Sequence, residues 1–175
     1  MPVVTVTTTY LQILAPDGLR PVHNDDPAVR VVEAEEPLPD FYRFLYGTVG
    51  RAYHWTDRLG WSDERLHSYL ASPAVSVHVL YVRGTPAGYV ELNREAPEPG
   101  TEVAYFGLFQ PFQGRGLGKY LLAEGVRRAF AAGPSRVWVH TCTLDGPHAL
   151  ANYQARGFVA YRTETHEQEL GPPRP

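Results

Sequence analysis

A glycine-rich stretch at residues 113–118, Gln-Gly-Arg-Gly-Leu-Gly, opens directly into an amphipathic segment predicted to be a helix, residues 119–130. Glycines at a strand-to-helix junction allow several backbone N–H groups to turn toward one point. The first amides of the helix are unpaired and carry the positive end of its dipole, so the junction favours an anion. Arg115 and Lys119 add the charge that a pyrophosphate attracts. The stretch therefore predicts a phosphate-binding turn.

The turn differs from two common phosphate-binding motifs. A P-loop ends in Gly-Lys-Ser/Thr, whereas Gly118-Lys119 is followed by Tyr120, which has no hydroxyl placed for magnesium. A dinucleotide fingerprint follows the first strand of a βαβ unit, whereas this turn comes late in the chain, after a predicted hairpin. Both motifs are therefore disfavoured.

The elements that position the turn are predicted from apolar periodicity and from turn residues. Strands are expected at residues 3–14, 29–35, 76–82, 87–93, 101–109, 136–141 and 158–169, and helices at residues 40–52, 62–71, 119–130 and 145–156. A short turn at residues 83–86 predicts a hairpin. Because a helix separates strands 101–109 and 136–141, these two are expected to be parallel. The pattern predicts a mixed α/β sheet flanked by helices.

Length and composition limit the class of protein. The chain has 175 residues, 43% of them hydrophobic, which is enough for one domain with a sizeable core. A net charge of −3 gives no field that would attract nucleic acid. The single cysteine, Cys142, excludes an intramolecular disulfide and suits a reducing compartment. Residues 1–14 resemble neither a signal peptide nor a membrane span, so a cytoplasmic protein is expected, and residues 171–175 are expected to be a disordered tail.

The element order and two motifs resemble the GNAT superfamily of N-acetyltransferases. The cofactor signature of that family is Gln/Arg-x-x-Gly-x-Gly/Ala, and its second signature is a helix with Ala, then Tyr, then Gly-Phe. The matching residues are Gln113, Gly116 and Gly118 for the first, and Ala149, Tyr153, Gly157 and Phe158 for the second. The resemblance covers roughly residues 29–169, so strand 3–14 lies outside the minimal fold. It departs at Gly146, where the family usually has an asparagine.

The resemblance implies a mixed, mostly antiparallel central sheet of about six or seven strands with a splayed parallel pair, flanked by about four helices. It also implies acetyl-CoA as acetyl donor, with its pantetheine arm entering the gap between the splayed strands. The backbone N–H of Leu108 is then the candidate oxyanion donor. The residues implied in binding acetyl-CoA are Phe106, Gly107, Leu108, Gln113, Gly114, Arg115, Gly116, Leu117, Gly118 and Lys119.

Acetyl transfer to an amine needs an acid for the leaving thiolate and a base for the amine. Tyr153 occupies the position of the general acid in many family members, and a phenol stays protonated at neutral pH. Glu102 is the first candidate for the base, since some family members carry a catalytic glutamate there. Alternation places it on one face with Ala104, Phe106 and Leu108, where desolvation raises a carboxyl pKa.

Two alternatives to Glu102 stay open. Glu91 shares a strand face with Tyr89 and Asn93, a polar row suited to line the acceptor site. Water can also take the proton, because positioning alone supplies much of the rate.

The loop Tyr53-His54-Trp55 is a candidate acceptor contact, because aromatic faces bind cationic amines. We therefore expect an N-acetyltransferase acting on a primary amine of a small cationic metabolite. One alternative acceptor is a peptide or protein N-terminus or lysine, and an alternative of another class is a non-catalytic acyl-CoA-binding sensor or assembly module. No histidine or cysteine spacing predicts a metal site. Family members are often dimers, so a homodimer is one assembly state that the resemblance implies.

Overall fold

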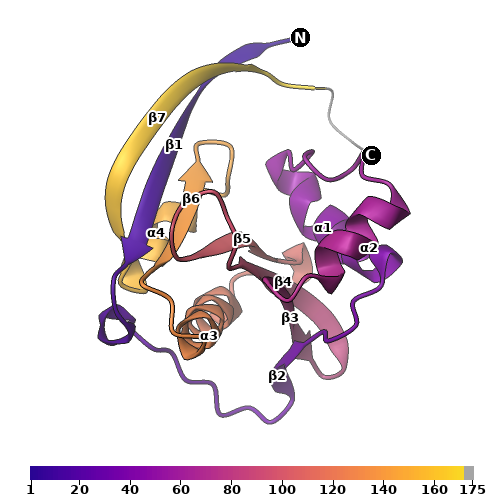
Figure 1. Ribbon diagram of the computed structural model, residues 1–175, viewed down its shortest axis with the longest axis vertical. Helices are drawn as coiled ribbons and strands as arrows, with labels where there is room; N and C mark the ends of the chain where they lie inside the picture. The colour runs from indigo at the N-terminus through magenta and orange to yellow at the C-terminus, as the bar shows by residue number, and fades with distance from the viewer. Residues whose placement is uncertain (172–175) are drawn as a thin grey trace.

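The computed structural model describes residues 1–171 and is built on a seven-stranded sheet of order β2-β3-β4-β5-β6-β1-β7 (Figure 1). The strands are β1 (Val3–Ile13), β2 (Val29–Glu33), β3 (Val75–Val82), β4 (Thr85–Asn93), β5 (Thr101–Leu108), β6 (Val137–Cys142) and β7 (Val159–Glu169). The helices are α1 (Pro39–Gly50), α2 (Asp63–Ala71), α3 (Leu117–Ala131) and α4 (Ala149–Ala155). The tail predicted at 171–175 lies outside the described residues, except for Gly171.

The predicted fold class is confirmed. Neighbouring strands are antiparallel throughout the described sheet except β5 and β6, which are parallel because α3 carries the chain back between them. Helix α4 begins at Ala149, four residues later than predicted, because Asp145 has another role. Its carboxylate accepts hydrogen bonds from the Thr141 hydroxyl and the Cys142 N–H, and so closes the end of β6.

Strand β1, which the resemblance leaves outside the minimal fold, lies inside the sheet between β6 and β7. It pairs antiparallel with β6 over Thr8–Ile13 and with β7 over most of its length. Leu11 is 0% exposed and Ile13 is 2% exposed, so this strand also contributes to the core. Beyond β6, β1 and β7 continue as a two-stranded arm (Figure 1).

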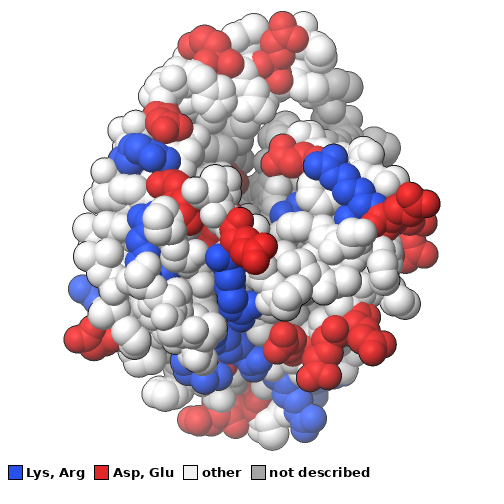
Figure 2. All heavy atoms as spheres, in the orientation of Figure 1, with Lys and Arg blue, Asp and Glu red and all other residues white. Residues whose placement is uncertain are grey.

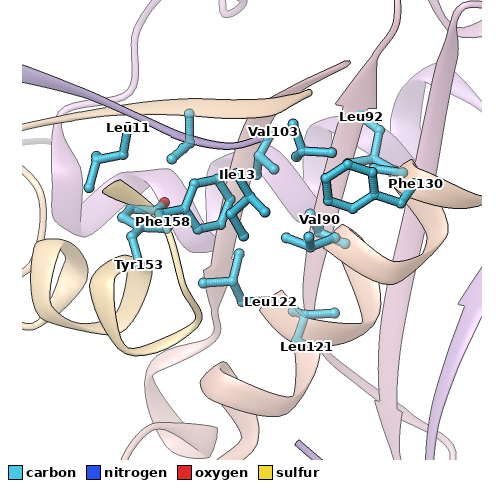
Figure 3. Close-up of a cluster of buried hydrophobic side chains, with 14 of the residues drawn as sticks. Leu11, Ile13, Val90, Leu92, Val103, Leu121, Leu122, Phe130, Tyr153 and Phe158 are labelled. Atoms are coloured by element: carbon cyan, nitrogen blue, oxygen red, sulfur yellow. The ribbon is translucent and has the colours of Figure 1, made fainter. Parts of the chain in front are cut away.

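Two apolar cores cover opposite faces of the sheet. On one face, Leu121 and Leu122 of α3 pack against Val90 of β4 and Phe158, and Tyr153 lies at the border of this cluster (Figure 3). On the other face, Leu45 and Val49 of α1 belong to a second cluster under α1 and α2, together with Leu66, Val79 and Tyr89. Each fully buried aliphatic side chain contributes about 1.5–3 kcal/mol. The two clusters hold β4 and β5 between two helical layers.

The side chains of strand β5 change the face of the sheet to which they point half-way along the strand, because the strand has a bulge there. Glu91 of β4 pairs with Tyr105 and Leu92 with Val103, so Ala104 is left without a partner on β4. This extra residue moves every later side chain of β5 to the other face. Phe106 and Leu108 pack toward α3, with Val103, whereas Tyr105 packs with the cluster under α1 and α2.

The predicted shared face of Glu102, Ala104, Phe106 and Leu108 is therefore wrong. Glu102 pairs with Asn93 of β4 and with Trp138 of β6, and it lies on the α1 and α2 side. A bulge of one residue leaves no mark in the apolar pattern, so the sequence alone could not show it.

Candidate active site

A cavity of about 600 Å³ lies where β5 and β6 diverge. The parallel ladder covers only Thr101 with Val137 and Glu102 with Trp138, after which the two strands separate. The lining joins both faces of the sheet: Leu108 and Tyr153 come from the α3 side, and Glu102 from the other. Figure 2 shows the surface hollowed between the arm formed by β1 and β7 and the helices α1 and α2. The cavity can therefore admit two molecules that meet in the gap.

The glycine-rich turn forms one end of this cavity. Gly114 has φ 78° and Gly116, which caps the N-terminus of α3, has φ 75°. Such angles suit glycine and few other residues. The side chain of Leu117 is buried, so only its backbone is available at the turn. Arg115 and Lys119 are exposed and do not line the cavity, and the Arg115 guanidinium lies over the Phe112 ring.

Six of the ten residues predicted to bind acetyl-CoA line the cavity. They are Phe106, Gly107, Leu108, Gln113, Gly114 and Gly118. A Cβ added to Gly107 would collide with Cγ1 of Val49 in α1, so there is no room for a side chain at this position. The strand backbone rather than a side chain is thus what Gly107 presents to the gap.

The backbone N–H of Leu108 points into the gap. The next amide, Phe109 N–H, donates to the Ala87 carbonyl of β4 at 2.8 Å. Because successive strand amides point in opposite directions, the Leu108 N–H faces away from β4 and toward β6. Gln113 supports this end of the strand, since its side-chain amide donates to the Leu108 carbonyl at 3.4 Å. The amide of Leu108 is thus directed at the space where a carbonyl oxygen would need a donor.

Tyr53 accounts for the glycine at position 146. A Cβ on Gly146 would lie 3.2 Å from Cε1 of Tyr53, so the tyrosine ring fills the place of a side chain there. The Tyr53 hydroxyl also accepts a hydrogen bond from Gln113 Nε2 at 3.1 Å. Tyr53 therefore lies between the glycine-rich turn and the loop before α4, and it lines the cavity.

His54 and Trp55 line the other part of the cavity wall. The Trp55 ring packs edge-on against Tyr105, with centroids 4.8 Å apart. His54 has φ 59°, an uncommon value outside glycine, where the chain turns from the short 3-10 turn Arg51–Tyr53 into the loop. The loop that follows brings Asp57 to the cavity, where its carboxylate accepts a hydrogen bond from the Tyr105 hydroxyl at 2.9 Å.

Tyr153 of α4 is 7% exposed and lines the cavity. Its ring packs edge-on against Phe106 and Phe158, with centroid distances of 6.1 and 5.8 Å. Burial raises the pKa of its phenol, and the nearby Asp145 carboxylate raises it further. The phenol is therefore protonated over the physiological range and can donate a proton.

Glu102 also lines the cavity, with its side chain 14% exposed. Burial raises the pKa of this carboxyl to about 7, and the Glu91 carboxylate adds to the shift while the Arg58 guanidinium opposes it. A carboxyl that titrates near neutral pH is suited to exchange protons during a reaction.

Glu91 does not line the cavity, in contrast to the expectation. Its side chain is 0% exposed, and both carboxylate oxygens accept hydrogen bonds from Arg58 Nη1, at 2.7 and 2.6 Å. The guanidinium lies over the rings of Tyr69 and Tyr105, at 4.2 and 4.6 Å from the centroids. The Glu91 carboxylate is thus held in a buried ion pair with Arg58 and not at the cavity surface.

Several residues of the site were missed from the sequence. Asp57, Arg58, Tyr105, His140 and Asp145 all line the cavity. Arg58 and Asp57 stand in a loop, where no periodicity predicts a direction. Tyr105 lies beyond the bulge, so simple alternation places it on the wrong face. His140 shares a face with Trp138 on β6, which alternation does predict, but the sequence does not show that this face borders a cavity.

The family is decided by comparison with known proteins. The sequence pattern of the acetyltransferase (GNAT) family matches residues 40–158, more than half of the chain. The chain belongs to the acetyltransferase (GNAT) family. A search of curated proteins gave no match.

Solved structures of GNAT proteins share this fold. The GCN5-related N-acetyltransferase from Kribbella flavida has a TM-score of 0.66 at 20% identity, over 94% of this chain and 58% of that one. The GCN5-related N-acetyltransferase from Sphaerobacter thermophilus has a TM-score of 0.61 at 17% identity, over 99% of this chain and 54% of that one. An aminoglycoside acetyltransferase from an uncultured soil metagenomic sample, in complex with trehalose, has a TM-score of 0.60 at 18% identity. The match covers 76% of this chain and 90% of that one. The chain spans 52–64% of the length of the first five similar structures.

The described part of this GNAT chain contains neither a metal-binding cluster nor a membrane-spanning helix. Within residues 1–171, no group of three or more His, Cys, Asp or Glu side chains is placed to hold a metal ion. None of the helices in that range is long and apolar enough to cross a lipid bilayer.

Proposed function

We propose that this chain is an N-acetyltransferase that moves an acetyl group from acetyl-CoA directly to a primary amine. The observation that carries the proposal is the cavity between the diverging strands β5 and β6. It joins the glycine-rich N-terminus of α3 on one face of the sheet to a cluster of carboxylates on the other. Such a passage allows donor and acceptor to approach the same point from opposite sides.

The donor end fits acetyl-CoA. The amides around Gly114, Gly116 and Gly118 would bind the pyrophosphate, helped by the dipole of α3. Arg115 and Lys119 stand at the rim and would pair with the phosphates from outside. The gap-facing edge of Phe106, Gly107 and Leu108 would bind the pantetheine arm through its backbone.

Three groups of the chain would carry the reaction. The Leu108 N–H donates to the carbonyl oxygen on which negative charge develops. The Tyr153 hydroxyl donates its proton to the leaving sulfur, and Glu102 takes a proton from the attacking amine. The two titratable groups suit these roles near neutral pH, since burial keeps the Tyr153 phenol protonated and raises the pKa of Glu102 to about 7.

A small cationic amine is the acceptor class that the charges favour. Asp57, Glu102 and Asp145 all border the cavity, whereas its one arginine, Arg58, is neutralised by Glu91. The carboxylates attract an ammonium group, and the Trp55 and Tyr105 rings offer faces to it. A similar structure is that of an aminoglycoside acetyltransferase in complex with sisomicin, which supports a small amine as acceptor. The single cysteine fits a reducing compartment, for which we propose the cytoplasm.

The test is release of free CoA from acetyl-CoA with a panel of amines, comparing the protein with its Tyr153→Phe variant. The panel contains polyamines, amino acids, aminoglycosides, and short peptides with a free lysine or N-terminus. Turnover with one class, lowered about 10²-fold by Tyr153→Phe, supports the proposal.

The other results point elsewhere. Turnover confined to the peptides assigns the alternative acceptor. Tight acetyl-CoA binding by calorimetry, without CoA release for any amine, favours a non-catalytic acyl-CoA-binding module. No binding at all contradicts the role given to the glycine-rich turn.

A further inference from the structure

Glu102 of β5 lies beside His140 of β6 within the cavity. Their nearest atoms, Oε1 of Glu102 and Nε2 of His140, are 3.6 Å apart. In the described part of the chain, His140 is the one basic side chain in ion-pair contact with this carboxylate. The two side chains differ in access to water, because Glu102 is 14% exposed and His140 is 48% exposed. The carboxylate is the inner group and the imidazole is the outer one.

The backbone explains why the two residues meet. Glu102 pairs with Trp138 in the parallel ladder, and His140 lies two residues further along β6 on the same face. Strand β5 pairs with β6 only as far as Glu102 and Trp138, so no later residue of β5 pairs with His140.

Neighbouring rings hold the imidazole in place. The Tyr10 ring of β1 lies 5.5 Å from it and the Trp138 ring 6.3 Å, between centroids. Tyr10 is fixed in turn by its hydrogen bond to Glu164 and by the Arg162 guanidinium over its ring. The ring of His140 is thus oriented by residues that do not touch the cavity's contents.

We propose that Glu102 and His140 act as a pair, in which His140 carries the proton of the acceptor amine from Glu102 to solvent. This inference rests on the proposed function of Glu102 as base. Every turnover leaves one proton on a carboxyl that is almost closed to water. That proton must leave before the next amine can react, and His140 is the partner that reaches water.

The proton transfers balance without any further reactant. An N–H bond of the ammonium breaks and an O–H bond forms on Glu102. The O–H bond then breaks as an Nε2–H bond forms on His140, once the two side chains close from 3.6 Å to hydrogen-bond distance. The imidazolium then loses a proton to water, and the neutral ring returns to the tautomer with a free Nε2 by proton exchange with solvent. The net result is one proton moved from the substrate to solvent, with no change in oxidation state.

Charged side chains from several elements face the pair. Glu102 faces Glu91, Arg58 and Glu98, and His140 faces Asp145, Asp57, Glu98 and Glu164. The cavity walls lower the pKa of His140 by partial desolvation, although half of its side chain remains open, and the nearby carboxylates oppose the shift. The pKa of Glu102 is raised to about 7.

The test compares acetyl transfer by the wild-type chain with His140→Ala and His140→Gln. We expect kcat to fall about 10²-fold or more in both variants, the lower bound set by the usual contribution of a proton-transfer group. Added imidazole should restore turnover by His140→Ala in proportion to its concentration, whereas His140→Gln should stay slow. The Kd for acetyl-CoA should not change. His67→Ala, at an exposed position on α2, is the matched control and should behave as wild type.

A reaction without amine corrects for acetylation of imidazole itself, and circular dichroism checks that each variant is folded. The inference is overturned if kcat is unchanged in the variants. It is also overturned if glutamine restores kcat and imidazole does not, since His140 would then only position Glu102. A wild-type chain that acetylates none of the amines removes the proposed function itself, which is a separate result.

Discussion

At the scale of single residues, the ion pair between Arg58 and Glu91 joins the cavity wall to the sheet. Arg58 belongs to the loop between α1 and α2, and Glu91 to the middle of β4. The Tyr69 hydroxyl accepts from Arg58 Nη2 at 2.8 Å and donates to Glu91 Oε2 at 3.2 Å. The Arg58 side chain thereby anchors the loop that carries His54, Trp55 and Asp57 to the sheet.

We predict that Arg58→Met lowers the free energy of unfolding by about 3–5 kcal/mol, because it leaves the Glu91 carboxylate buried and unpaired. The double variant Arg58→Met/Glu91→Gln should recover much of this loss, since no buried charge remains. Urea denaturation followed by tryptophan fluorescence measures both. Arg65→Met is the control: Arg65 also lies over an aromatic ring, Trp61 at 4.1 Å, but is exposed. Equal stability of the two single variants would contradict the prediction.

Glu102 links stability to pH. The unfolded chain releases this proton near pH 4.5, and the folded protein near pH 7, because burial raises the pKa. Between these values the folded state binds more protons than the unfolded state, so the free energy of unfolding falls as pH rises. The stabilisation is complete below pH 4.5 and is lost as pH passes through 7.

We therefore predict that Glu102→Gln is more stable than wild type above pH 7, by up to about 3 kcal/mol for a shift of this size. The two proteins should converge toward pH 4.5, where the wild-type carboxyl is neutral as well. Denaturation at a series of pH values measures the difference, with the exposed Glu36→Gln as control. Parallel curves for wild type and Glu102→Gln would show that the carboxyl is not desolvated.

At the scale of elements, β1 fixes the half of the sheet that carries β6. Residues Thr8–Ile13 of β1 pair with β6 along one edge, and residues Val3–Gln12 pair with β7 along the other. Without β1, the edge of β6 and the face that holds Trp138 and His140 would lose their main support. Strand β1 comes first in the chain, far in sequence from β6, yet it pairs with the strand that lines the candidate active site.

We predict that Leu11→Ala in β1 costs about 2–5 kcal/mol of unfolding free energy, as for other fully buried leucines. Thr5→Ala, in the exposed part of the same strand, should change it by about 0.5 kcal/mol or less. Thermal or urea denaturation of both variants measures the contrast. A loss below 1 kcal/mol for Leu11→Ala, of the order of the usual surface effects, would mean that β1 docks weakly.

At the scale of the whole molecule, the charges are distributed without one dominant field. Figure 2 shows acidic and basic side chains interspersed over this face, with a run of basic ones near its middle, close to α3. A net charge of −3 agrees with this mixture. Binding of a cationic acceptor then depends on carboxylates inside the cavity rather than on the overall charge.

Most of the fold could be predicted because it depends on local patterns. The helix predicted at residues 62–71 has a local start signal, since the Ser62 hydroxyl accepts the Arg65 N–H at the start of α2. The glycines of residues 113–118 were expected at a helix N-terminus, and Gly116 caps α3. The features that could not be predicted depend on pairing between distant segments: the place of β1 in the sheet, the bulge at Ala104, and the contact of Arg58 with Glu91.

The short ladder between β5 and β6 also has a mechanical consequence. The sheet consists of two parts, β2-β3-β4-β5 and β6-β1-β7, whose strands are joined to each other only at Thr101 with Val137 and Glu102 with Trp138 in the described structure. Elsewhere the two parts are held by packing, chiefly beneath α3. The softest motion of such a molecule is a small change of the angle between its halves, and its pivot lies at Glu102. The stiffness of the protein is therefore lowest along the line where donor and acceptor would meet.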